Sequence, residues 1–132
     1  MAFTAEDRAE IVELSARCLR AFDVSEMQVW SQCFGEEGVY ETSPENRIQG
    51  RKALQDFASQ LDFEIPIRHI PSAIWVQGEE ESASVLSYFT LMTLGNAPET
   101  IGVGRFEDRM GKENGAWKFM HRRVRMDWNK GD

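Results

Sequence analysis

The chain has 132 residues, the size of one ordinary domain, and 42% of them are hydrophobic while 28% are charged. This balance is typical of a globular protein and excludes a disordered one, so we predict a single domain over residues 1–132. The net charge of −7 makes nucleic acid and anionic membranes poor partners. The basic cluster at residues 121–125 (HRRVR) lies among apolar residues, which favours a solvated strand face over a nucleic-acid site.

The first half of the chain predicts three helices and one strand. The first helix should cover residues 4–22, because Thr4 and Asp7 form a capping-box pattern and apolar residues follow at three- and four-residue spacing. The elements expected after it are a short helix capped by Ser25 with Gln28 and running to residue 34, a strand over residues 39–43, and a third helix after Gly50.

From residue 67 the pattern changes to long strands. They are expected over residues 67–77, 83–94, 100–110 and 116–128, joined by turns rich in Gly and Asn. Consecutive hairpins give an antiparallel meander, and strands this long should twist and curl. The predicted class is therefore α+β: a cone-shaped barrel with the N-terminal helices packed on the concave face of a curled antiparallel sheet. The apolar interior of such a cone is a natural small-molecule pocket.

His69 lies in the first long strand and is one of only two histidines. Strict alternation places it on one face with Trp75, and places Ile74 and Val76 on the other face. Both faces are mostly apolar, so a buried histidine with a purely structural hydrogen bond fits the pattern. The alternative is a general base, because imidazole titrates near neutral pH and can take a proton from carbon or water.

Asp23 directly follows Phe22 on the apolar stripe, at the end of the first helix. A carboxylate there is usually a loop or capping residue. If the first helix crosses the sheet, however, its end would place Asp23 inside the cone, where a buried carboxylate needs a partner. His69 would suit, because an Asp can orient the imidazole and stabilise the imidazolium. Spacing alone does not bring the two residues together.

Several segments occur in the order and form seen in SnoaL-like proteins of the nuclear-transport-factor-2-like superfamily: AFDVSEMQVWSQCFGEEGVYE, GRKAL, RHI, SYF, GRFEDRM and WKFMHRRVRMDW. The resemblance covers nearly the whole chain and implies an α+β cone. It says less about activity, because this fold hosts many chemistries. The small subunit of ring-hydroxylating dioxygenases, which is mainly structural, shares the Arg-His pair, the Gly-Arg step and the Trp-x-Lys last strand ending in Asp.

The pattern is most similar to scytalone dehydratase, bile-acid dehydratase and lindane dehydrochlorinase. These enzymes use an Asp at the end of the first helix and a His in the first long strand as a dyad, and Asp23 and His69 fall on those positions. The resemblance further implies that Tyr40 polarises a substrate carbonyl and that Arg122 or Arg123 points into the pocket. Strand parity leaves that choice open, and Arg122 is taken as the candidate. Phe89 stands where scytalone dehydratase has a second His.

The predicted function is that of a cofactor-independent lyase, dehydratase-like, or an isomerase acting on a small apolar or cyclic molecule. Its catalytic residues would be Asp23 and His69. The residues expected to bind the substrate are Tyr40, Phe22, Trp75, Phe89 and Arg122. The alternative is a non-catalytic ligand-binding or assembly module resembling the dioxygenase small subunit. An epoxide hydrolase would need a close Asp-Arg-Asp set, which the sequence alone does not assemble.

Composition and motifs also bear on cofactors, partners and location. Two distant histidines give no metal-ligand spacing and no Gly-rich phosphate loop follows a strand, so neither a metal nor a nucleotide cofactor is expected. The N-terminal sequence does not resemble a signal peptide, and Cys18 and Cys33 suit buried thiols in a reducing cytoplasm. No membrane span is expected. Apolar residues assigned to the outer sheet face predict a homo-dimer or homo-trimer: Ile74, Val76, Met126 and Trp128.

Overall fold

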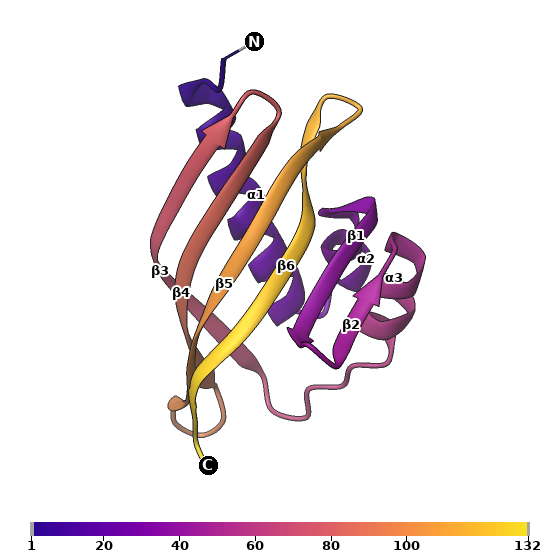
Figure 1. Ribbon diagram of the computed structural model, residues 1–132. Coiled ribbons are helices and arrows are strands. Elements are labelled where there is room, and N and C mark those ends of the chain that lie inside the picture. Colours follow the sequence, from indigo (N-terminus) through magenta and orange to yellow (C-terminus); the bar gives the residue numbers. More distant parts are fainter. Residues whose placement is uncertain (1, 132) are drawn as a thin grey trace.

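A computed structural model describes residues 2–131 and confirms the α+β architecture (Figure 1). The helices are α1 (Ala5–Asp23), α2 (Met27–Gln32) and α3 (Arg51–Ser59). The strands are β1 (Phe34–Ser43), β2 (Asn46–Gln49), β3 (Ile67–Glu79), β4 (Ser82–Thr93), β5 (Glu99–Glu113) and β6 (Ala116–Asn129). They form one sheet in the order β2-β1-β6-β5-β4-β3, in which only the β1–β6 pair is parallel.

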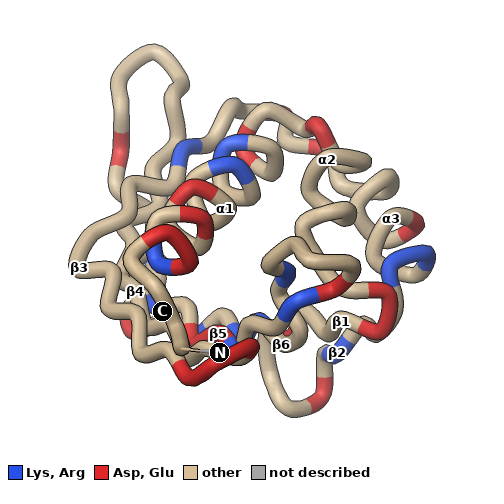
Figure 2. The backbone as a smooth tube through the Cα atoms, turned by 90° about the horizontal axis from the view of Figure 1, so that it is seen from above, with Lys and Arg blue, Asp and Glu red and all other residues tan. Residues whose placement is uncertain are grey.

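The sheet curls around α1 and α2 (Figure 2). Figure 2 also shows that basic and acidic residues are interspersed along the chain. The main core lies between these helices and the concave sheet face. Its largest fully buried side chains include Trp30, Trp117, Phe34 and Phe119. Among residues 2–131, none of the helices combines the length and the apolar character needed to cross a bilayer.

The start of α1 is built as the sequence predicts. The Thr4 side chain accepts a hydrogen bond from the Asp7 backbone N–H at 3.0 Å, and the Asp7 carboxylate accepts one from the Thr4 backbone N–H at 2.9 Å. The predicted cap at Ser25 is wrong, because this residue has a left-handed φ of 63° and α2 begins only at Met27. Tight reversal of the chain after α1 takes precedence over the local capping pattern.

Strand β1 begins at Phe34, five residues before the predicted start at 39, and β2 is an additional strand. In the sequence, GEEG at residues 35–38 is expected only to end the second helix. Phe34 instead pairs with Phe119 of β6 and Val39 pairs with His121, so residues 35–38 form an irregular bulge between two pairs made with a strand distant in sequence.

A β-bulge in β3 changes which face each side chain occupies. Ser72 pairs with Tyr88 and Trp75 with Leu86, so two residues, Ala73 and Ile74, oppose the single residue between those partners. Ala73 takes a left-handed φ of 51° there. Alternation shifts by one residue past the bulge.

This shift corrects two predictions. Val76 turns inward and belongs to the core, whereas Trp75 lies on the outer face with 59% of its surface exposed. Trp75 therefore does not share a face with His69. The sequence predicts Met126 on the outer face, but its sulfur lies on the inner side of the sheet. A Cβ added to Gly104 would lie 3.1 Å from this sulfur and 2.7 Å from the inward-facing Phe89 ring.

Candidate active site

The end of α1 meets the beginning of β3 through Asp23 and His69. Asp23 Oδ1 lies 2.6 Å from His69 Nδ1, and Asp23 Oδ2 accepts a hydrogen bond from the His69 backbone N–H at 2.8 Å. Both side chains are only 9% exposed. Because the carboxylate accepts at Nδ1, the neutral ring carries its proton there and Nε2 is the basic nitrogen.

Three aromatic rings surround the imidazole. The ring centroids of Phe89, Phe22 and Phe106 lie 5.1, 5.8 and 6.1 Å from that of His69. Gly104 lets Phe89 approach, since a side chain there would collide with its ring. The Asp23–His69 pair therefore lies in an apolar setting from which bulk water is largely excluded.

A small cavity of about 30 Å³ adjoins His69. Its lining includes Phe22, Trp30, Tyr40, Phe106 and Arg122, so the helices and the sheet both contribute. A water needs on the order of 10–15 Å³ of this kind of volume, so the cavity has room for about two waters. Of the predicted pocket residues, Phe22, Tyr40 and Arg122 line it, Phe89 packs on His69, and Trp75 lies on the opposite sheet face.

Arg122 is the last-strand arginine that points inward. Its side chain is 4% exposed and forms a bidentate pair with Asp108, with Nε to Oδ1 at 2.9 Å and Nη2 to Oδ2 at 3.1 Å. The guanidinium also stacks 3.8 Å above the Phe106 ring. Burial opposes its charge, but the neighbouring Asp108 carboxylate outweighs that effect and raises the pKa of Arg122. Arg123, by contrast, is 51% exposed on the outer face.

Asp108, the partner of Arg122, is a candidate-site residue that the sequence did not predict. It alternates with Phe106 and Met110 on the inner face of β5 and pairs in register with Arg122. That register depends on an irregularity in the β5–β6 pairing between Arg109 and Met110, which the local sequence does not predict. The only available signal was a carboxylate at an inward position of an otherwise apolar alternation.

Tyr40 presents a phenol to the same cavity. Its ring packs edge-on against Trp30 with a centroid distance of 5.1 Å. Burial raises the pKa of Tyr40 to about 12, so the hydroxyl remains protonated at neutral pH. A protonated phenol in this position is a hydrogen-bond donor for a substrate oxygen.

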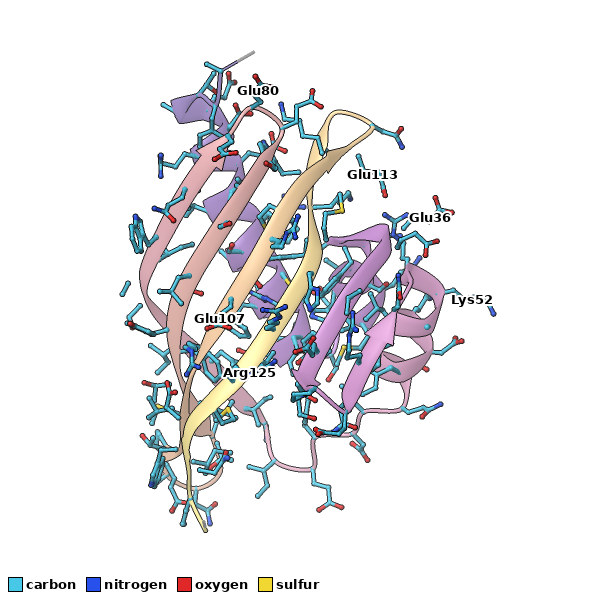
Figure 3. The ribbon with its side chains drawn as sticks, in the orientation of Figure 1. Glu36, Lys52, Glu80, Glu107, Glu113 and Arg125 are labelled. Atoms are coloured by element: carbon cyan, nitrogen blue, oxygen red, sulfur yellow. The ribbon has the colours of Figure 1, made fainter. Side chains whose placement is uncertain are left out.

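The second histidine has a carboxylate partner on the other side of the sheet. His121 Nε2 lies 3.0 Å from Glu41 Oε1, and Arg125 also contacts Glu41. Arg125 and Glu107 project from the neighbouring strands β6 and β5 (Figure 3). The charged residues of the cluster at 121–125 thus form an outer-face ion network, except Arg122, which points inward as Val124 does. Of the two His–carboxylate pairs, only the one at His69 adjoins the inner cavity.

The arrangement contains proton-transfer groups and hydrogen-bond donors. No set of three or more His, Cys, Asp or Glu side chains within residues 2–131 is placed to hold a metal ion. The site residues are therefore a His–Asp pair, a phenol and a guanidinium facing a small cavity inside an α+β cone.

A SnoaL-like domain model matches residues 4–123, and the chain belongs to that family. A protein of unknown function with a cystatin-like fold from Nostoc punctiforme is 25% identical, with 96% of each chain covered and a TM-score of 0.86. A candidate scytalone dehydratase from Novosphingobium aromaticivorans is 18% identical, with 96% of this chain and 87% of that chain covered and a TM-score of 0.83. ActVI-ORFA from Streptomyces coelicolor is 20% identical, with 91% and 97% covered and a TM-score of 0.80. The last two show the fold alone. No curated protein matches the chain.

Proposed function

We propose that this protein is a cofactor-independent lyase or isomerase that uses His69 as a general base on a small, mostly apolar molecule. The observation that carries the proposal is the Asp23–His69 hydrogen bond beside a cavity lined by Tyr40 and Arg122. His69 Nε2 makes no hydrogen bond to any residue in the described range 2–131, so it is available to a substrate.

In the proposed reaction, Nε2 of His69 removes a proton from a carbon next to a carbonyl group. The electron pair moves into the carbonyl, and the Tyr40 hydroxyl and an unused Arg122 N–H stabilise the oxyanion. In a dehydration the pair then returns and expels a β-hydroxyl group, which leaves as water with the proton from the imidazolium. In an isomerisation the same proton returns to a different carbon.

Asp23 contributes by fixing the ring and stabilising the imidazolium formed in the first step. Its second hydrogen bond, to the His69 backbone N–H, prevents the carboxylate from turning away. General-base assistance of this kind contributes about 10²–10⁴-fold, and the dry surroundings add to it.

Deuterium exchange tests the proposal without knowledge of the natural substrate. Cyclic β-hydroxy ketones are incubated with the protein in D₂O, and NMR follows both exchange at the carbon next to the carbonyl and loss of water. We expect His69→Gln and Asp23→Asn each to lower the enzyme-dependent rate by about 100-fold or more, as expected for loss of a general base.

His121→Gln is the matched control, because it removes the other carboxylate-paired imidazole from the outer face. It should leave the rate unchanged. Equal rates in wild type and His69→Gln would refute the proposed base.

A further inference from the structure

A second cavity, of about 190 Å³, lies between α1 and β3, next to the one at His69. Both cavities are lined by Leu19, Phe106 and Arg122, so these residues form the partition between them. The difference in size decides which cavity can hold the body of a ligand. An enclosed apolar cavity of about 150 Å³ binds benzene in another protein. The space here is of similar size but opens to solvent beside Val12 and Ile74, which are 40% and 41% exposed, whereas the 30 Å³ space holds only about two waters.

The walls of the larger cavity come from one stripe of α1 and from the β3 bulge. Val12, Ser15, Ala16 and Leu19 contribute from α1 at helical spacing. Opposite them, the bulged residues Ala73 and Ile74 line the cavity together with the residue they jointly face, Ser87. The bulge thus forms this wall, and the left-handed φ of Ala73 is a strained conformation of the kind that clusters at ligand sites.

Ser15 contributes a buried polar atom to this cavity that the fold does not use. Its hydroxyl oxygen is buried and has no hydrogen-bond partner among residues 2–131. A helical serine commonly donates to the carbonyl four residues earlier, but Ser15 does not. Leaving a buried hydroxyl unsatisfied costs stability, and an oxygen on a bound molecule would remove that cost.

We propose that this cavity receives a compact one- or two-ring molecule and that Ser15 recognises it by a hydrogen bond to a hydroxyl or carbonyl oxygen. The reacting end of the molecule reaches His69 past Leu19 and Phe106, the residues common to both cavities. The role of the cavity in a reaction rests on the proposed function. The Ser15 contact does not, because it is a binding interaction.

Two probes of similar shape test the Ser15 contact: 2-naphthol, which carries a hydroxyl, and naphthalene, which does not. Amide NMR titration of the isotope-labelled protein should show saturable shifts at Val12, Ser15, Ile74 and Ser87 for both probes. Ser15→Ala should weaken 2-naphthol binding by about 2- to 10-fold, the value of one neutral hydrogen bond, and leave naphthalene binding unchanged. The variant should also unfold at the same or a higher temperature, because no contact within the fold is lost.

Ser31→Ala is the matched control. The Ser31 hydroxyl is also buried on a helix, but it donates to the Gln28 carbonyl at 3.0 Å and lies outside the cavity. This variant should bind both probes as the wild type does. The proposal is overturned if neither probe binds saturably, if the shifts lie elsewhere, or if Ser15→Ala weakens both probes equally.

The two proposals can fail separately. Asp23→Asn should still bind 2-naphthol, because the carboxylate lies outside the larger cavity. If 2-naphthol binds beside Ser15 as expected but His69→Gln does not lower the rate of deuterium exchange, the proposed reaction is refuted and the ligand site is retained. His69-dependent exchange together with a failed probe titration would refute the ligand site alone.

Discussion

Removing Asp108 should destabilise the fold strongly, because its partner cannot escape to water. The Arg122 side chain is 4% exposed and that of Asp108 is fully buried. In Asp108→Leu the guanidinium would be left among the Phe106 and Phe119 rings and the Cys18 thiol. Breaking a buried pair on one side typically costs about 3–5 kcal/mol. Domains are stable by only about 5–15 kcal/mol, so the loss is a large fraction of the total.

The double variant Asp108→Leu with Arg122→Met separates burial of a lone charge from loss of packing. Replacing both members of a buried pair by apolar residues is often neutral or stabilising, by about 1–4 kcal/mol, so the double variant should recover most of the free energy of unfolding. Urea unfolding followed by tryptophan fluorescence measures both variants. Glu99→Gln, which breaks an exposed pair with Lys130, should cost less than about 1 kcal/mol.

If Asp108→Leu costs no more than Glu99→Gln, the charge of Arg122 is not held by Asp108 and the reasoning fails. If instead the double variant is as unstable as the single one, the cost comes from altered packing. Either result would remove the basis for treating Asp108 as the residue that positions Arg122 at the cavity.

Two further predictions concern Tyr40 and Trp75. The difference in tyrosinate absorbance between wild type and Tyr40→Phe should titrate at about pH 12. The contribution of Tyr40 to the free energy of unfolding should be intact below pH ~10 and should decline as the pH rises from there, because the phenol of the unfolded chain ionises first. An absorbance difference that titrates near pH ~10 would contradict the burial argument. Trp75, Tyr88 and Trp128 expose aromatic surface on the outer sheet face, so sedimentation should find a homo-dimer or homo-trimer that Trp75→Ser weakens. A monomeric wild type would refute this assembly.

The predictable parts of the fold are those with a local cause. The capping residues Thr4 and Asp7 fix the start of α1, and the turn sequences fix the three hairpins of the meander. The extension of β1 back to Phe34 has no local cause, because it depends on pairing with β6. Ser25 shows the opposite error, since a good capping residue occupies a position where the chain reverses.

The candidate site divides in the same way. Asp23 and His69 could be named from resemblance, and their contact requires α1 to run antiparallel alongside β3, so that the end of the helix lies at the start of the strand. Alternation failed for Trp75 because a bulge inserts one residue between it and His69. A bulge inserts one residue that breaks the alternation of side chains between the two faces. A prediction that assumes strict alternation along the strand therefore cannot locate it.

The parallel pairing of β1 with β6 has a consequence for synthesis on the ribosome. β1 follows α2 directly, yet on one side it pairs with β6, which comes after all the other described strands in the chain. At about 5–20 residues per second, α1, α2 and the β1–β2 hairpin wait several seconds before residues 116–129 emerge. Until then β1 and β5 each present an open edge at the place where β6 will insert. Folding of the sheet is therefore completed only after residues 116–129 have left the exit tunnel, and a chain terminated before β6 would be an aggregation-prone fragment.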